Sequence, residues 1–444
     1  MRRVTLRLCT LFEAPDLVKA SLESFQLSKV PALLGLLCSL TLMMGCGRVA
    51  DTDLVGYAYP SVVNAAALSY SDAAEGLSFN QLLHNRELVD HEGAGGIVSP
   101  NNDTLYSGLS LDLRQSPQIV TLPSVPEGTY QSMMITDLRA YNVAEIVNDR
   151  GGGRFMFAVL GYSGEVPADV QLIETESDIL LGIVRTEVVD ADDLSLVFEL
   201  QDGIRIDPLL PVADNLTRSA DLPSIDPDSL EMSVLNHWVA LAQWAMRHSP
   251  ALDASDLEYK TRIEQLTPGL LNKIVFAYGV YRLKRDGANM TSTRGLYGRR
   301  DQVTGSHWER GAITTFSHLA LSPERALYPT LTVDSDGEEL LGCRAYTATF
   351  KDVPVRAFWS LTVYETDSKQ FVPNPQQLYR ISNKTAVQAA DGSVTIHLGG
   401  DPDADNYLPL PADCAAWYTM IRFYEPEQPL LDGSWPTPQI VLVD

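Results

Sequence analysis

The stretch Val355-Arg356-Ala357-Phe358-Trp359-Ser360-Leu361-Thr362-Val363-Tyr364 decides the fold class, because apolar side chains occupy its odd-numbered positions. Alternation with a period of two is typical of a β-strand that turns one face to a core. Residues 394–398 and 417–425 show the same period, and connections rich in proline separate the three runs. Residues 322–444 are therefore expected to form an antiparallel sandwich or jelly roll.

Residues 56–215 also carry short β-like runs that are separated by turns. The runs are Tyr130–Leu138, Arg154–Leu160, Ile179–Val188 and Leu194–Leu200, and a helical approach, Val62–Asn85, precedes them. Short strands without long helices between them favour a β-sandwich over a doubly wound sheet. The following segment, 207–228, is rich in proline and aspartate and is interpreted as a linker.

The middle segment, residues 226–320, is expected to be helical. Apolar residues recur at positions i, i+4 and i+7 over 230–245, which indicates one amphipathic helix. A capping box at Ser255 predicts a second helix. Thr267-Pro268 predicts the start of a third, which ends at Gly287 behind two cationic residues.

Composition excludes several classes of function. The chain has 444 residues, of which 45% are hydrophobic and 20% charged, so it is neither disordered nor embedded in a membrane throughout. Its 33 basic and 57 acidic residues give a net charge of −24. Nucleic-acid binding needs Lys and Arg to neutralise phosphates, so no nucleic acid is expected as a partner. A polybasic membrane-surface role is disfavoured for the same reason.

An apolar run near the N-terminus, residues 30–46, predicts export. It has about 15 apolar residues, which is short of the ~20 that a spanning helix needs but suits a signal peptide. Met43-Met44-Gly45-Cys46 resembles the lipobox of bacterial lipoproteins. The resemblance implies that residues 1–45 are removed as a signal peptide and that Cys46 carries the lipid. A plain signal and an uncleaved anchor are the alternatives.

The neighbours of this run add two expectations. The first 29 residues contain three acidic side chains, which a short basic signal segment lacks, so translation is expected to start near Leu27 or Val30. Gly47, rather than Asp, follows Cys46. By resemblance to enterobacterial sorting, this favours the periplasmic side of the outer membrane or the cell surface over the inner membrane. The protein would then reach the membrane through its lipid anchor only.

Two cysteines, Cys343 and Cys414, remain in the mature chain once Cys46 carries a lipid. In an oxidising compartment they form either a disulfide or two separate buried thiols. They have no CxxC spacing, so zinc is not indicated. The acidic loop 401–405 is followed by Asn406, where a calcium loop needs glycine. No metal and no cofactor is expected.

Two groups of motifs resemble a known pair of families. Ser99-Pro100-Asn101-Asn102-Asp103-Thr104-Leu105-Tyr106-Ser107, followed by Asp112-Leu113, resembles the hallmark of domain of unknown function 1254. Six later motifs resemble the partner, domain of unknown function 1214: Phe358–Tyr364, Asn374-Pro375, Asp391–Ser393, Asn406–Pro411, Arg422–Pro426 and Asp432–Trp435.

The resemblance covers nearly all of residues 56–444 and implies a fold that is mainly β with a helical insert. Its parts would be an N-terminal immunoglobulin-like β-sandwich, the middle helical segment and a C-terminal jelly-roll β-sandwich. It implies no established reaction. Tyr407 stands where the family has Trp, and Leu378 stands where it has Arg, so no ligand role of that Arg is carried over.

Asp103 is the candidate catalytic residue of the first motif. Asn and Asp side chains bond to nearby backbone amides, so the motif is first interpreted as a stabilised loop at the entry to a strand. The alternative makes Asp103 a general acid or base and Asn102 an orienting donor. A glycosidase would place a second carboxylate within about 5–10 Å, and the candidates are Asp112, Asp137 and Glu145.

Aromatic and amide side chains would complete a ligand site. Tyr106 and Trp359 would stack on a sugar-like ring, and Tyr364 and Asn374 would join them from the second domain. A place in the core is the competing interpretation of Trp359, which lies in the alternating strand. The sequence has no GxSxG, HExxH or phosphate-binding loop. Two hypotheses follow: a lipid-anchored protein that binds a glycan-like or small polar ligand, and a hydrolase or lyase that acts on one.

Overall fold

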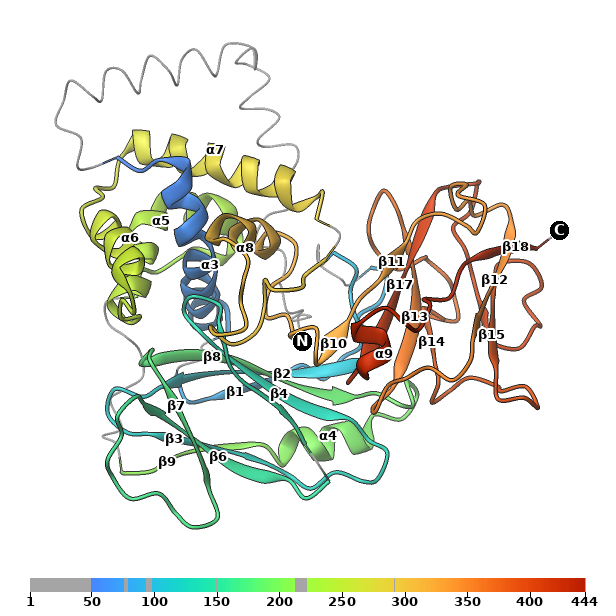
Figure 1. Ribbon diagram of the computed structural model, residues 1–444, viewed down its shortest axis with the longest axis horizontal. Helices are drawn as coiled ribbons and strands as arrows, with labels where there is room; N and C mark the ends of the chain where they lie inside the picture. Colours follow the sequence, from blue (N-terminus) through green and yellow to red (C-terminus); the bar gives the residue numbers. More distant parts are fainter. Residues whose placement is uncertain are drawn as a thin grey trace.

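The computed structural model shows three packed parts: a helical body, an N-terminal β domain and a C-terminal β domain (Figure 1). The residues it describes are 49–75, 79–92, 98–148, 150–211, 222–290 and 292–443. The expected signal peptide, 1–45, and Cys46 lie outside these residues. Within the described ranges the fold is mainly β, with several sheets that do not close into a barrel, and its helices are concentrated in the middle segment.

Two sheets form the N-terminal β domain. The first has the order β1 (Leu82–His84), β2 (Thr104–Asp112), β8 (Ile179–Glu187), β4 (Gln131–Asp137) and β5 (Asn142–Val147). The second has the order β7 (Gln171–Thr175), β6 (Gly153–Val159), β3 (Gln118–Leu122) and β9 (Arg205–Pro208). Neighbouring strands are antiparallel, except that β6 and β7 are parallel. Apolar side chains of both sheets fill the core between them, among them Leu109, Val120 and Phe157.

The first sheet of this domain is buried on both faces. Every residue of β4 and β8 is buried, so these strands lack the alternation of a sheet with one face in water. On the inner face, Met133 and Val184 pack in the core of the β domain. On the outer face, Leu181 packs with the helical body, whereas Ile183 packs with residues of the C-terminal domain. The outer face of one sheet therefore joins all three parts.

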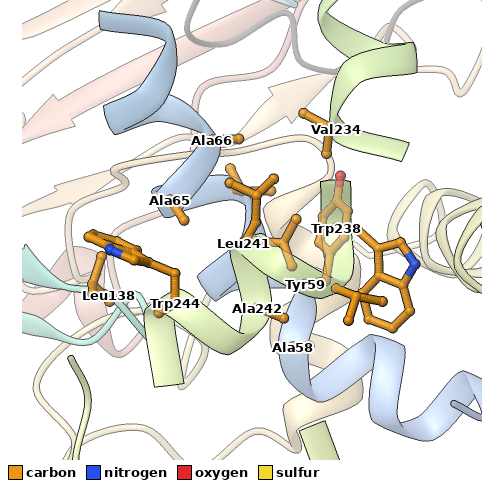
Figure 2. Packing of buried hydrophobic residues seen from close by; sticks show 14 of the residues in the cluster. Ala58, Tyr59, Ala65, Ala66, Leu138, Val234, Trp238, Leu241, Ala242 and Trp244 are labelled. Carbon is orange, nitrogen blue, oxygen red and sulfur yellow. The ribbon is translucent and has the colours of Figure 1, made fainter. Parts of the chain in front are cut away.

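The helical body is built around α3 (Thr52–Glu75), in which every residue from 58 to 70 is buried. The remaining helices are α5 (Leu230–Arg247), α6 (Ala254–Glu264), α7 (Leu270–Gly287) and α8 (His307–Thr314), and the short 3-10 helix η3 (Pro227–Ser229) precedes α5. A helix that is apolar on all sides requires neighbours on all sides. Figure 2 shows Ala58 and Ala66 of α3 close to Leu241 and Ala242 of α5.

Small residues allow α3 and α8 to approach closely. A Cβ atom on Gly311 of α8 would lie 2.6 Å from the carbonyl oxygen of Gly56 in α3. A Cβ atom on Gly56 would lie 2.5 Å from the ring of Trp308. Real Cβ atoms do not come this near to a carbonyl oxygen or a packed ring, so glycine at both positions sets the distance between the helices.

Two sheets also form the C-terminal β domain. The first has the order β10 (Ala326–Leu327), β17 (Trp417–Tyr424), β13 (Trp359–Glu365) and β14 (Arg380–Ser382), and β11 (Thr330–Leu331) also pairs with β17. The second has the order β16 (Tyr407–Leu408), β15 (Val394–Leu398), β12 (Ala345–Phe350) and β18 (Val441–Val443), and helix α9 (Gln428–Leu431) precedes β18. The alternation predicted for 355–364 is confirmed: Trp359, Leu361 and Val363 lie in the core between these sheets.

A disulfide links the two sheets of the C-terminal domain at one end. Cys343 precedes β12 and Cys414 precedes β17, and the structure joins them across a sequence separation of 71 residues. A cross-link over a loop of this length removes much of the conformational freedom of the unfolded chain.

Two elements of the N-terminal half differ from the expectation. The helix expected at Val62–Asn85 is α3, which begins earlier, ends at Glu75 and packs mainly against α5, α7 and α8, whereas the end of the expected range forms strand β1. The strand expected at Leu194–Leu200 is wrong, because this segment belongs to α4 (Ser195–Asp202). Its buried residues Val197 and Leu200 are three positions apart and share a helix face. A short apolar run is compatible with the period of a helix and with that of a strand, and tertiary packing decides which of the two forms.

The three helices predicted in the middle segment are present, but two of them begin at other residues, and a fourth helix, α8, was not predicted. Asp253, not Ser255, caps α6, because its side chain accepts a hydrogen bond from the Asp256 N–H at 2.8 Å. Helix α7 begins after Gly269 rather than at Thr267-Pro268. Asp and Ser are both good caps, so Asp253 and Ser255, two positions apart, leave the start of α6 open by a few residues.

A histidine contact joins the helical body to the N-terminal β domain. Asn64 of α3 donates through Nδ2 to the Asp137 carbonyl oxygen at 3.1 Å and accepts from His318 Nε2 at 2.7 Å. The other ring nitrogen, Nδ1, is buried and has no hydrogen-bond partner among the described residues. Burial lowers the pKa of His318 from its usual 6.5 to about 4, since protonation would place an unpaired N–H there.

This arrangement makes stability depend on pH. The contribution of neutral His318 is complete above pH 6.5 and is lost as the pH falls towards 4, because the unfolded chain takes up the proton first. The loss is on the order of 3 kcal/mol of unfolding free energy. The variant His318→Gln does not titrate and should lose less between pH 7 and pH 4.5 in urea unfolding. His397→Gln, in the C-terminal domain, is the control, and equal losses in all three proteins would contradict the assignment.

Candidate functional site

The motif at residues 99–104 forms the entry to β2 and lies between the two β domains. Asn101 Oδ1 accepts a hydrogen bond from the Asp103 N–H at 2.7 Å, which turns the chain towards the strand. Asn102 holds the preceding segment: its amide donates to the Val89 carbonyl oxygen at 2.6 Å, and its Oδ1 accepts from the Val89 N–H at 3.0 Å. These bonds stabilise the loop that carries Asp103.

Asp103 has no exposed surface and meets three side chains of the C-terminal domain. The Ser360 hydroxyl donates to Oδ2 at 2.7 Å. Arg380 Nε lies 3.3 Å from Oδ1, and Arg422 Nε lies 4.0 Å from Oδ2. A buried carboxyl group is costly without charged or hydrogen-bonding partners, so these contacts allow Asp103 to lie inside the protein. We call Asp103, Ser360, Arg380 and Arg422 the Asp103 cluster.

The two arginines of the cluster also bind the backbone of the N-terminal domain. Arg422 donates through Nη2 to the carbonyl oxygens of residues 99 and 100, at 3.1 and 3.3 Å. Arg380 donates through Nη2 to the carbonyl oxygen of Val188 at 2.5 Å. Each guanidinium group therefore joins the Asp103 carboxyl group to carbonyl groups next to it. The cluster holds the two domains together through ion pairs to Asp103 and charge-assisted hydrogen bonds to the backbone carbonyls.

Strand alternation explains which residues of β13 reach this interface. Tyr364 shares a face with Ser360, donates to the Pro100 carbonyl oxygen at 2.6 Å and accepts from Arg422 at 2.6 Å. Trp359 is on the opposite face and stacks on Phe350 in the core, with the ring centroids 4.0 Å apart. The structure thus gives Trp359 the core position that was the competing interpretation, away from the Asp103 side of the strand.

Asn374 lies in a turn of the C-terminal domain. Its Oδ1 accepts from the Leu378 N–H at 2.8 Å, and its Nδ2 donates to the Val372 carbonyl oxygen at 2.9 Å. These bonds use the side chain to close the turn. Of the residues proposed from the sequence, the structure brings four to the domain interface, namely Asn102, Asp103, Tyr106 and Tyr364.

The three candidates for a second carboxylate have structural partners of their own. Asp112 lies at the far end of β2 from Asp103, roughly 25–30 Å away at the usual rise of a strand, and pairs with Arg114 at 2.7 Å. Asp137 Oδ1 accepts from the backbone in its own turn. Glu145 Oε1 accepts from the Ser322 N–H at 2.6 Å. None of these contacts joins them to Asp103.

A second group of polar residues lies beside the cluster, between β2, β8 and β17. It consists of Asn101, Tyr106, Arg185, Tyr328 and Tyr424, and we call it the Arg185 site. Asn101 donates to the hydroxyls of Tyr106 at 2.8 Å and Tyr424 at 3.2 Å. Arg185, paired with Tyr106 across the two strands, has its guanidinium group 5.9 Å from the centre of that ring.

The guanidinium group of Arg185 is incompletely bonded. Nη2 donates to the Leu319 carbonyl oxygen at 2.6 Å, whereas the buried Nη1 has no hydrogen-bond partner in the described part of the chain. Tyr106 and Tyr328 next to it are both partly exposed. Burial raises the pKa of Tyr328 to about 12 against the lowering effect of Arg185, so its hydroxyl stays protonated and can donate.

The sequence alone did not identify Arg185, Tyr328, Arg380 or Arg422 as site residues. The sequence did contain one signal for Arg185, which directly follows the apolar run 179–184. A cationic residue that is buried in such a strand usually has a specific partner. Arg422 stands in a family motif, but its partner Asp103 is more than 300 positions earlier in the chain. Sequence spacing cannot show such a contact.

No group of three or more His, Cys, Asp or Glu side chains placed to hold a metal ion occurs among the described residues. The acidic loop 401–405 is closed by its own hydrogen bonds, such as the Asp403 N–H to Asp401 Oδ1 at 3.0 Å. Across the same described ranges, no helix has the length and apolar character to cross a membrane.

Comparison with family models shows what the chain resembles. Residues 79–208 match the model for the protein of unknown function DUF1254, and residues 325–428 match the model for the protein of unknown function DUF1214. The chain carries DUF1254 followed by DUF1214. This confirms the resemblance inferred from the motifs. The Asp103 cluster joins the two domains, since Asp103 lies in DUF1254 and its three partners lie in DUF1214.

Two solved structures are similar to this chain. The VPA0106 protein from Vibrio parahaemolyticus is 23% identical, with a TM-score of 0.62, over 89% of this chain and 100% of that one. An uncharacterized protein from Burkholderia cenocepacia is 14% identical, with a TM-score of 0.43, over 88% of both chains. The first similarity shows a shared fold. A comparison with curated proteins found no match.

The variant Asp103→Asn tests the role of the cluster. It keeps the shape of the side chain but leaves two buried arginines without their counter-charge, which should lower the unfolding free energy by about 3–5 kcal/mol. The control is Asp202→Asn, since Asp202 pairs with Arg86 at the surface and should contribute about 0–1 kcal/mol. Urea unfolding measures both. A variant as stable as the parent would show that Asp103 does not hold the domains together.

Proposed function

We propose that the protein is a lipid-anchored protein of the cell envelope that binds a small polar or glycan-like ligand at the Arg185 site. The observation that supports this proposal is the buried Nη1 of Arg185, which lacks a partner among the described residues beside two partly exposed tyrosines. A guanidinium group binds carboxylates through paired hydrogen bonds, and tyrosine rings pack against the faces of sugars. An acidic sugar is therefore the ligand class that we propose.

Binding is favoured over catalysis by the surroundings of Asp103. A general acid or base must reach the substrate within hydrogen-bond distance. Asp103 has no exposed surface, and its carboxyl oxygens face Ser360, Arg380 and Arg422. The hydrolase or lyase hypothesis needs this group to be free, so the binding hypothesis is the one we adopt.

The anchor and the detailed topology complete the proposal. Cys46 would carry the lipid after removal of residues 1–45, on the periplasmic side of the outer membrane or at the cell surface. We also propose the finer fold assignments implied by the family resemblance. The N-terminal β domain would be immunoglobulin-like, and the C-terminal β domain would be a jelly roll.

Acylation is tested with the variant Cys46→Ser, produced from the full chain in a Gram-negative host. Wild-type protein should sediment with membranes, and its N-terminal peptide should begin at Cys46 and carry acyl chains in mass spectrometry. Cys46→Ser should lose both properties, because serine has no thiol to alkylate. Cys38→Ser, in the segment that would be removed, is the control. Exported protein with an uncut Gly45-Cys46 bond would refute the anchor.

Ligand binding is tested with D-glucuronate, and with glucose as the uncharged comparison, by calorimetry at low salt. Arg185→Lys keeps the charge but loses the planar fork, so glucuronate should bind about tenfold more weakly or worse. Arg154→Lys, which changes a surface ion pair with Asp169, should bind as the parent does. Thermal unfolding checks that both variants fold. Equal affinity of parent and Arg185→Lys would contradict the site.

A further inference from the structure

The outer face of α7 is apolar although it is exposed. Leu270 is 72% exposed and Tyr281 is 50% exposed. The apolar residues of this face are spaced three and four apart and are Leu270, Ile274, Ala277, Tyr278 and Tyr281. Positions with this spacing share one side of a helix. On the opposite side, Phe276 and Leu283 are buried in the helical body.

Helix α7 is also cationic in an acidic protein. It has one acidic residue, Asp286, against four cationic ones, which are Lys273, Arg282, Lys284 and Arg285. The whole chain has 57 acidic and 33 basic residues. At 3.6 residues per turn, Lys273 and Lys284 border the apolar face on one side, Arg282 borders it on the other, and Arg285 lies among the apolar residues near the C-terminal end of the face. Exposed apolar residues with cationic residues beside them suit a helix that lies in a membrane surface.

The described chain starts next to this helix. The N–H of Ala50 donates to Asn272 Oδ1, in the first turn of α7, at 2.8 Å. Four residue steps separate Cys46 from Ala50, and they span at most roughly 14 Å when fully extended. A lipid on Cys46 therefore holds the first turn of α7 within that distance of the membrane surface.

We propose that the apolar face of α7 lies on the surface of the bilayer that holds the acylated Cys46. This proposal rests on the lipid anchor of the proposed function. Leu270 and Ile274 would enter the outer edge of the acyl region, and Tyr278 and Tyr281 would lie at the depth of the headgroups, where tyrosine is enriched. The excess of cationic over acidic residues on this helix would attract anionic lipid headgroups.

The contact would fix the orientation of the protein on the membrane. Helix α7 is the outermost element of the helical body and lies on its side away from the sheets (Figure 1). With α7 on the membrane, the N-terminal β domain would face away from it.

Depth-dependent quenching tests this arrangement. The full-length variants Ile274→Cys and Val387→Cys are produced in a Gram-negative host, labelled with a polarity-sensitive fluorophore and placed on vesicles of phosphatidylethanolamine and phosphatidylglycerol, with and without brominated acyl chains. The disulfide of Cys343 and Cys414 leaves no other thiol in the described part of the chain. Ile274 is 40% exposed on α7, and Val387 is 54% exposed in the C-terminal domain.

We expect the label at position 274 to shift to the blue and to be quenched, because the apolar face would lie about 5–10 Å into the interface. The label at position 387 should change little. Acylated, vesicle-bound protein without quenching at 274 would overturn the α7 contact and leave the anchor intact. Protein without acyl chains on Cys46 would overturn both. A blue shift without vesicles that grows with protein concentration would show that a second copy, not a membrane, covers α7.

Discussion

A buried carboxyl group at the boundary of two β domains determines how this protein is assembled. Asp103 enters from the N-terminal domain and finds its partners, a hydroxyl and two guanidinium groups, on the C-terminal domain. Separating the domains would leave charged groups of both surfaces without these partners. Charged groups of this kind fix one relative orientation more strictly than apolar packing does, because hydrogen bonds require direction as well as contact. The Arg185 site contains residues of both domains, so its geometry depends on this relative orientation.

The outer face of the first sheet of the N-terminal β domain joins this domain to both the helical body and the C-terminal β domain. The sheet that carries β2 and β8 has no face in water: one end of its outer surface packs with the helical body and the other with the C-terminal domain. Loss of either neighbour would expose a large apolar surface. The three parts are therefore expected to unfold as one cooperative unit rather than as independent domains.

Local patterns in the sequence predicted local structure well. Period-two alternation placed Trp359 in a strand, spacing of apolar residues placed α5, and capping and proline signals placed α6 and α7, whereas α8 was not predicted. Leu194–Leu200 was assigned wrongly because a short apolar run fits a strand and a helix alike. The site was half predicted: the motif supplied Asp103 and Tyr106, but their arginine partners depend on pairing between distant strands. The net charge was an incomplete guide for a similar reason. A chain with a net charge of −24 still contains α7, a helix with more cationic than acidic residues.

The position of α3 has a consequence for biogenesis. This helix is made early, yet the helices that bury its apolar surface begin at Leu230 and end at Thr314. While the chain emerges from the ribosome, α3 has no permanent neighbours, and exposed apolar segments at this stage aggregate. Productive folding of the helical body must therefore wait for α8, so a chaperone that shields residues near 58–70 until α8 is made would suit this topology.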